Sequence, residues 1–149
     1  MIRNQLARTL TRLSLVCLFP PSGLDKIINW DEAMQQARSG ILPGAPALLA
    51  ASVVLETLAP VAIVAEKHDR EAAALLAAFC AATALVYHQF WTYDDLMAKQ
   101  KSEGREHLWE FLKNFGLVGG LMFVALEPKA PQLAAPAPGE APARVAPAA

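Results

Sequence analysis

The sequence has little charge and no excess of either sign. Lysine, arginine, aspartate and glutamate make up 18% of its 149 residues, with thirteen basic side chains against fourteen acidic ones. A protein that binds nucleic acid needs a positive field along one face, and this composition offers none. We therefore expect no nucleic-acid partner.

Groupings that would hold a metal or an intrinsic cofactor are also lacking. The two cysteines, Cys17 and Cys80, form no CxxC motif and no cluster with histidine, which argues against an iron–sulfur or zinc site. Haem between two histidines needs a second histidine besides His88 in an apolar stretch, but His68 and His107 fall in the links. The sequence has no glycine-rich nucleotide loop and no serine or cysteine triad. We expect no metal site and no intrinsic cofactor.

Long apolar stretches are what the chain does have. Hydrophobic residues make up 54% of it, and its mean hydropathy is +0.29. Four stretches, at about 6–24, 46–65, 72–91 and 108–126, are close to the ~20 residues with which a helix crosses ~30 Å of hydrocarbon. Because short links join them, the sequence predicts an all-α fold: an integral membrane four-helix up-down bundle over residues 1–126, in contact with the lipid bilayer.

The two ends of the chain carry further signals. Arg3, Arg8 and Arg12 precede or enter "LSLVCLF", so the first stretch could also be a cleaved signal, although no small-x-small cleavage site follows. The pair Pro20–Pro21 suits neither interpretation well. The same arginines favour a bundle with both termini inside the cell. Residues 127–149 hold six of the eleven prolines and predict a Pro/Ala-rich disordered tail.

Several polar residues interrupt the apolar stretches. Lys26, His88 and Asn114 share one side of the membrane whichever way the bundle is inserted. Glu56 lies ~15 Å into the second stretch, near mid-depth, where a charged carboxylate costs ~2.5 kcal/mol or more. We therefore expect Glu56 and Asn114 to face the bundle interior, while Lys113 reaches toward the head groups.

Residue spacing in the fourth stretch indicates helix packing. Gly116 and Gly120, with Gly119 between them, form a small-xxx-small pair that lets another helix approach closely. Glu110 lies three residues before Lys113, so the two charges can neutralise each other.

Four segments together resemble a known family: "SGLDKI" after the first stretch, "VVLETLAP" around Glu56, "YHQFW" after the third stretch and "FLKNFGLVGGLMFVAL" as the fourth. Over residues 3–126 the chain resembles the DoxX family of small four-helix bacterial membrane proteins. The resemblance implies a multi-pass protein of the bacterial inner membrane. It also implies an accessory subunit of a quinone-linked oxidoreductase, such as thiosulfate:quinone oxidoreductase, working with a soluble or membrane redox partner.

The polar residues then provide a site hypothesis with a quinone as the candidate ligand. A quinone head group needs hydrogen-bond donors for its carbonyls and a protonatable neighbour. Four residues are the candidates for this polar pocket: Lys26, Glu56, His88 and Asn114. Three aromatic residues are the candidates for its wall: Phe90, Trp91 and Phe115.

Structural roles are the alternatives at the same positions. His88 could be an interfacial hydrogen-bonding residue, Asn114 could join two helices, and Lys26 could anchor the end of a span. For the whole chain the alternatives are a non-catalytic scaffold that assembles a partner enzyme and, more weakly, a small-solute carrier. The sequence sets neither an oligomeric state nor a reaction that the chain catalyses by itself.

Overall fold

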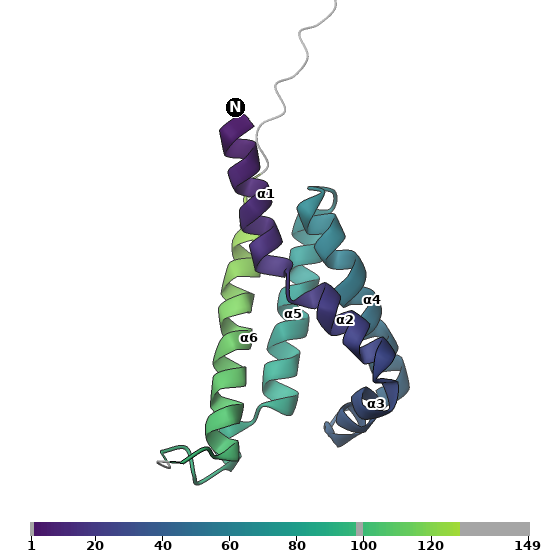
Figure 1. The fold of residues 1–149 in the computed structure, drawn as a ribbon, viewed down its shortest axis with the longest axis vertical. Helices are drawn as coiled ribbons and strands as arrows, with labels where there is room; N and C mark the ends of the chain where they lie inside the picture. The colour runs from purple at the N-terminus through teal and green to yellow at the C-terminus, as the bar shows by residue number, and fades with distance from the viewer. Residues whose placement is uncertain (1, 98–99, 129–149) are drawn as a thin grey trace, which may run out of the picture.

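Every regular element in the part of the chain that the structure describes is a helix. The computed structural model describes residues 2–97 and 100–128. In chain order the helices are α1 (Ile2–Val16), α2 (Phe19–Ile28), α3 (Trp30–Ser39), α4 (Ala45–Val64), α5 (Asp69–Tyr87), the short 3₁₀ helix η1 (Phe90–Thr92) and α6 (Glu103–Leu126) (Figure 1). The prediction of an all-α fold is confirmed. All but the first two residues of the predicted tail lie outside the described residues.

Three segments are long and apolar enough to cross a membrane: Ala45–Val64, Asp69–Thr92 and Glu103–Leu126. They coincide within a few residues with the second, third and fourth apolar stretches of the sequence. The 20 residues of α4 extend about 30 Å at 1.5 Å per residue. Large apolar side chains such as Leu58, Leu75 and Phe123 point outward and are exposed. Such a surface suits lipid rather than water.

The first apolar stretch differs from the prediction of one helix over 6–24. The chain forms α1 and α2 instead, which are separated at Cys17 and Leu18. Pro20 and Pro21 have no amide hydrogen to donate, and a proline ring inside a helix clashes with the carbonyl group four residues earlier. Both prolines are accommodated in the first turn of a new helix, where the amide groups need no partner within the helix. Figure 1 shows the result, in which α2 leaves the direction of α1 and crosses α4.

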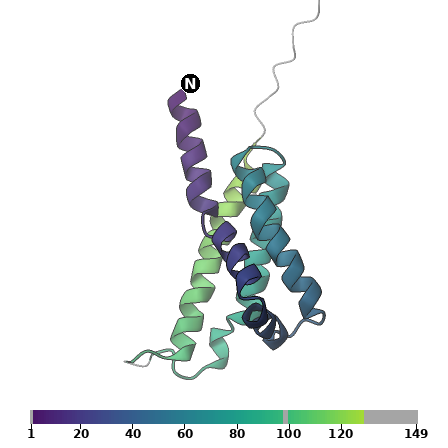
Figure 2. The same ribbon diagram turned by 45° about the vertical axis from the view of Figure 1, so that its right-hand side comes forward.

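Small side chains on α5 form the centre of the core. α5 lies between α4 and α6 (Figure 2). Its residues Ala73, Ala77 and Cys80 are buried, and their small size lets the neighbouring helices approach closely. Ile63 of α4 and Leu121 of α6 are buried against them.

α3 forms a separate, smaller packing layer at the beginning of α4. Its Ala37 is buried against Ala45 and Leu49 of α4, with Ala33 and Met34 packed beside them. The opposite face of α3 is exposed and carries charged residues. α3 is therefore an amphipathic helix of the kind that lies along a membrane surface.

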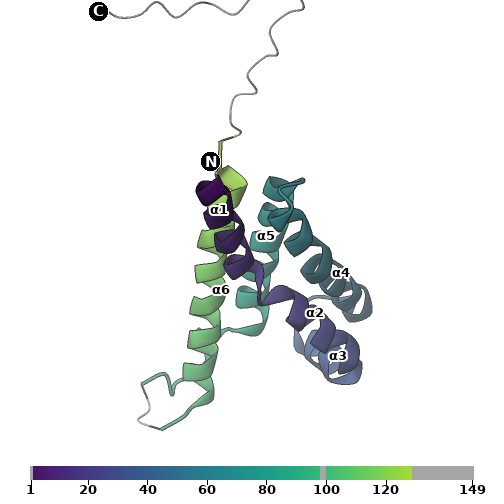
Figure 3. The ribbon, with the colours of Figure 1, turned by 45° about the horizontal axis from the view of Figure 1, so that its top comes forward.

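A buried arginine joins four helices at the opposite end of α4. Arg12 of α1 is 4% exposed. Its guanidinium group is 2.7 Å from Asp69 Oδ2, 3.0 Å from Glu127 Oε2 and 2.7 Å from the Ile63 carbonyl oxygen, to which it donates a hydrogen bond. These partners belong to the start of α5, the residue after α6 and the last turn of α4. Figure 3 shows α1 running beside the C-terminal part of α6 at this end.

Candidate functional site

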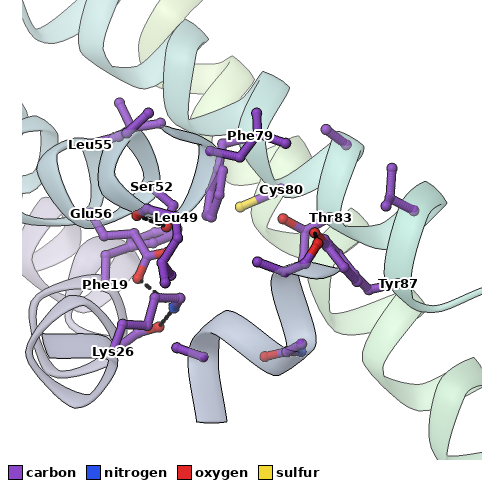
Figure 4. A pocket seen from close by; sticks show the side chains of 18 of the residues that line it. Phe19, Lys26, Leu49, Ser52, Leu55, Glu56, Phe79, Cys80, Thr83 and Tyr87 are labelled. Atoms are coloured by element: carbon purple, nitrogen blue, oxygen red, sulfur yellow. Dashed lines mark hydrogen bonds and ion pairs between the residues drawn. The ribbon is translucent and has the colours of Figure 1, made fainter. Parts of the chain in front are cut away.

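A cavity of about 340 Å³ lies between α2, α3, α4 and α5, with two residues of α6 contributing to its lining. Its walls are mostly apolar, with residues such as Phe19, Leu49, Leu55 and Phe79. Figure 4 shows Lys26 and Glu56 on one side of the cavity and Cys80, Thr83 and Tyr87 on the other. A few polar groups converging in an apolar cavity are typical of a small-molecule site.

The polar centre of the cavity is an ion pair between α2 and α4. Lys26 Nζ is 3.0 Å from Glu56 Oε2 and also donates a hydrogen bond of 2.7 Å to Ser22 Oγ. Glu56 is only 1% exposed, whereas the side chain of Lys26 is 24% exposed. The pairing neutralises a carboxylate that would otherwise be costly near the middle of an apolar helix.

The break before α2 and the glycine within it explain how Lys26 reaches Glu56. Ser22 and Lys26 are four residues apart and share one face of α2, so the hydroxyl group can orient the ammonium group. Gly23 lies directly against α4. A Cβ atom at this position would be 3.2 Å from Thr57 Oγ1 and 3.4 Å from Glu56 Cβ. The segment "SGLDKI" therefore supplies the close approach, the orienting hydroxyl group and the cation.

The second carboxylate oxygen of Glu56 has no partner in the part of the chain that the structure describes. Oε1 is buried, and no donor in the described residues reaches it. Ser52, one helical turn before Glu56, donates its hydroxyl hydrogen to the Leu49 carbonyl oxygen at 2.8 Å instead. A buried acceptor without a donor is rare in folded proteins because its lost hydration is not replaced. Glu56 thus contributes to the cavity lining a strong acceptor that has no donor among the described residues.

The wall opposite Glu56 comes from one face of α5. Cys80, Thr83 and Tyr87 line the cavity and follow the helical spacing i, i+3, i+7. Tyr87 also holds α3 in place, because its hydroxyl group donates a weak hydrogen bond of 3.4 Å to the Ala37 carbonyl oxygen. Sequence reasoning did not assign these residues to the site, although their spacing was a usable signal.

Of the polar residues that the sequence analysis selected, Asn114 also lines the cavity. Its amide nitrogen donates a hydrogen bond of 2.9 Å to the Glu110 carbonyl oxygen of its own helix. This hydrogen bond lies within α6, so it does not provide the link between two helices that was one alternative for Asn114. Lys113 pairs with Glu110 on the exposed side of α6.

The fourth selected polar residue, His88, lies outside the cavity lining. Its Nδ1 atom is 3.4 Å from Nδ1 of His107 on α6, and the His107 ring stacks on Tyr93 at a centroid distance of 5.0 Å. Sequence reasoning had placed His107 in a link, because the apolar stretch begins only at Leu108. The Ser102 hydroxyl group accepts a hydrogen bond from the Arg105 amide group and starts α6 earlier.

The aromatic residues selected for the wall form a cluster of their own around Phe111. The rings of Phe90 and Phe115 lie 5.1 and 4.6 Å from the Phe111 ring, and the Trp91 ring lies 5.8 Å from it. None of these four residues lines the cavity described above. The cluster packs η1 against α6.

The two glycines expected to pack helices differ in their surroundings. A Cβ atom at Gly120 would lie 2.7 Å from Leu15 Cδ1, so this glycine lets α1 approach α6. At Gly116 a Cβ atom would meet nothing within 4 Å. The small-xxx-small pair therefore contributes one close contact in the described fold.

Within residues 2–97 and 100–128, no group of three or more histidine, cysteine, aspartate or glutamate side chains is arranged to hold a metal ion. The chemical groups of the cavity are a buried carboxylate, a partly exposed ammonium group, hydroxyl groups, side-chain amides and a thiol. These groups can bind and orient a small ligand and can exchange protons with it.

Comparison with known proteins agrees with these features. The sequence model of the DoxX family matches residues 7–89, which is more than half of the chain. The matched region contains α2, Glu56 and the cavity-lining face of α5. Neither curated proteins nor solved structures give a match. The chain belongs to the DoxX family.

Proposed function

We propose that this protein binds the head group of a lipid-soluble quinone in the cavity between α2, α3, α4 and α5, as an accessory subunit of a membrane redox system. The observation that carries the proposal is the Lys26–Glu56 pair in an apolar cavity, with no donor for Glu56 Oε1 among the described residues. The pair offers a cationic donor and a carboxylate acceptor side by side. A quinone couple needs both kinds of group as it changes between its carbonyl and hydroxyl forms.

The size and walls of the cavity fit such a head group. Ligand sites usually have volumes of roughly 300–1,000 Å³ and mostly apolar walls. A volume of about 340 Å³ lies at the lower end of this range and suits one ring with small substituents. Leu18, Leu42 and Leu48 line the cavity and are also exposed on the outer surface. We propose that the hydrocarbon tail of the quinone leaves the cavity past these leucines into the lipid.

The electrons would come from a partner. The chain has two isolated cysteines and no cluster of ligands for a redox metal among its described residues. We therefore propose that a soluble or membrane partner carries the redox cofactors and that this chain supplies the quinone site.

We further propose that the protein is a four-span bundle of the bacterial inner membrane, with the broken pair α1–α2 as its first span. Four spans place both termini on the same side, that of Arg12, and we propose that this side is cytoplasmic because of the arginines near the N-terminus. Reporter fusions after Leu126 and within the link around Gly44 test this topology. A reporter that is active in the cytoplasm should work only after Leu126, and the reverse pattern would contradict the orientation.

Quinone binding can be measured with the full chain in nanodiscs of phosphatidylcholine. A fully substituted short-chain benzoquinone is the suitable probe, because its ring carbons carry no hydrogen for a thiol to replace. We expect saturable retention above that of empty nanodiscs. Thr83→Phe fills the cavity from α5 and should abolish the retention. Leu75→Phe places the same side chain on the exposed face of α5 and should leave it unchanged.

Loss of binding in Thr83→Phe counts only if the variant remains folded, which circular dichroism and size-exclusion chromatography show. If wild-type protein retains neither the quinone nor its hydroquinone above the level of empty nanodiscs, the proposal is wrong. It is also wrong if Thr83→Phe and Leu75→Phe bind equally well.

A scaffold role is the second candidate, and the surface of α6 favours it. Trp109, Leu112 and Phe123 on this helix are exposed, and Gly116 leaves a shallow place between them. A transmembrane helix of a partner could pack there. Co-purification of a redox enzyme that persists in Thr83→Phe would show that assembly does not depend on the cavity.

A further inference from the structure

We infer that the cavity binds the reduced, hydroxyl-bearing form of its ligand more tightly than the oxidised carbonyl form. This inference rests on the proposed function, because it concerns the same quinone site. It adds a direction: the site would favour the quinol over the quinone.

The argument begins with Glu56 Oε1. The carboxylate group has no hydrogen of its own, so both oxygens need donors. Lys26 supplies one at 3.0 Å from Oε2, whereas Oε1 is buried and has none in the described residues. The hydroxyl groups of Ser52 and Thr57 on α4 both donate to backbone carbonyl oxygens of their own helix instead. A donor for Oε1 is therefore expected from the ligand.

The quinone and the quinol differ in whether they can donate a hydrogen bond to Glu56. A quinol hydroxyl group can donate its hydrogen to Oε1. A quinone carbonyl group can only accept, so it would bring a second partial negative charge toward the carboxylate oxygen. The oxidised form is thus disfavoured twice, by the missing donor and by repulsion between two acceptors.

The other polar groups of the cavity discriminate less strongly in this way. The Lys26 ammonium group has three hydrogens and uses two of them, on Ser22 and Glu56. The third can donate to an oxygen of either form. The Asn114 amide nitrogen is bonded to the Glu110 carbonyl oxygen, and its Oδ1 atom is a neutral acceptor, weaker than a carboxylate oxygen. The discrimination therefore depends mainly on Glu56.

The size of the preference for the quinol follows from the strength of one hydrogen bond to a charged group. Such a bond corresponds to roughly a ten- to hundredfold difference in the dissociation constant. For a two-electron couple, a tenfold preference for the reduced form raises the midpoint potential of the bound couple by about 30 mV.

The experiment compares the two forms on three proteins in phosphatidylcholine nanodiscs. The ligands are a fully substituted short-chain hydroquinone, kept reduced without oxygen, and the corresponding quinone. The hydroquinone dimethyl ether, which has no hydroxyl hydrogen, is a redox-inert control. The proteins are the wild type, Glu56→Gln and Glu66→Gln, which makes the same change at an exposed position after α4.

On the wild type we expect the hydroquinone to bind at least about tenfold more tightly than the quinone or the dimethyl ether. Glu56→Gln should remove or reverse the preference, because its amide group can donate to a carbonyl oxygen. Glu66→Gln should retain it. Equal affinities on the wild type, or tighter binding of the quinone, overturn the inference and leave the proposed function standing.

Failure of all three ligands to bind wild-type protein would overturn the proposed function together with the inference. A preference that persists in a correctly folded Glu56→Gln protein would show that another group discriminates, which also contradicts the inference. Circular dichroism in the same nanodiscs establishes that the variants are folded.

Discussion

A single buried carboxylate determines the chemistry of the cavity. Glu56 is almost completely buried, and its only charged partner in the described residues is Lys26. Transferring both charges out of water costs more than an isolated pair usually returns, so such a pair is weak evidence for stability. An apolar pair would hold α2 to α4 as well or better. This is the reason for assigning the pair to ligand binding.

Replacing only one member of the Lys26–Glu56 pair should therefore destabilise the protein much more than replacing both. Lys26→Met leaves the Glu56 carboxylate buried without a counter-charge and should destabilise the protein by about 3 kcal/mol. Lys26→Met combined with Glu56→Leu should be as stable as the wild type. Unfolding in mixed micelles with a rising fraction of dodecyl sulfate, followed by circular dichroism, measures the difference. If the double variant is less stable than the single variant, the explanation is wrong.

A second prediction at the residue scale concerns two glycines. Gly23→Val would force α2 away from α4, because a Cβ atom alone would already lie 3.2 Å from Thr57 Oγ1. We expect a loss of about 1–3 kcal/mol, as in other overpacked cores. Gly116→Val is the matched control, since a Cβ atom there meets nothing within 4 Å. Similar unfolding transitions for the two variants would contradict the packing described for α2.

At the scale of elements, the break between α1 and α2 decides where Lys26 lies. A straight helix would carry Lys26 toward the membrane surface, far from the middle of α4. Because Pro20 and Pro21 start a new helix, α2 crosses α4 and places Lys26 beside Glu56 (Figure 1). Broken helices in membrane proteins commonly bring polar groups to sites within the apolar region.

Removing both prolines should straighten this segment. In Pro20→Ala/Pro21→Ala we expect α1 and α2 to merge and the distance between α2 and α4 to increase. Spin labels at the exposed positions Ile27 and Leu58, in a chain with both cysteines replaced by serine, report this distance by pulsed electron paramagnetic resonance.

Pro46→Ala provides the control for the loss of a proline. Pro46 lies in the first turn of α4, where no break follows it. This variant should leave the distance unchanged. An unchanged distance in the double alanine variant would mean that tertiary contacts, rather than the prolines, separate α1 from α2.

On the scale of the whole molecule, the two ends of the helices have different roles. At one end the buried guanidinium group of Arg12 joins α1, α4, α5 and the residue after α6 through two ion pairs and a backbone contact. At the other end α3 covers the beginning of α4, and the cavity opens between the helices. The helices are thus joined to one another at one end, and the cavity lies toward the other end. Under the proposed function, a ligand would enter the cavity there without separation of the whole bundle.

The two neighbouring arginines of α1 should differ strongly in their effect on stability. Arg12→Gln leaves Asp69 and the Ile63 carbonyl oxygen without their shared cation and should cost about 3 kcal/mol in the free energy of unfolding. Arg8→Gln removes a cation whose side chain is 50% exposed, so we expect at most about 1 kcal/mol. The same unfolding assay measures both. Equal losses would contradict a special role for Arg12.

The sequence predicted the helices more completely than the site. Long apolar stretches located α4, α5 and α6 within a few residues, because length and hydropathy are local properties. Of the residues selected for a site, Lys26, Glu56 and Asn114 line the cavity, whereas His88, Phe90, Trp91 and Phe115 lie elsewhere. The sequence predicts that Lys26, His88 and Asn114 share one side of the membrane, but it does not give the direction of each side chain around its helix.

By itself the sequence determined that this chain is an all-helical membrane protein of the DoxX family, with a costly carboxylate deep in an apolar helix. The tertiary structure alone decided that Lys26 pairs with Glu56, that Cys80, Thr83 and Tyr87 face them, and that no donor among the described residues reaches one carboxylate oxygen. The physical reason is that burial depends on local composition, whereas a contact between helices depends on their crossing angles and rotations. Here those were set by one proline-induced break and by the close approach at Gly23.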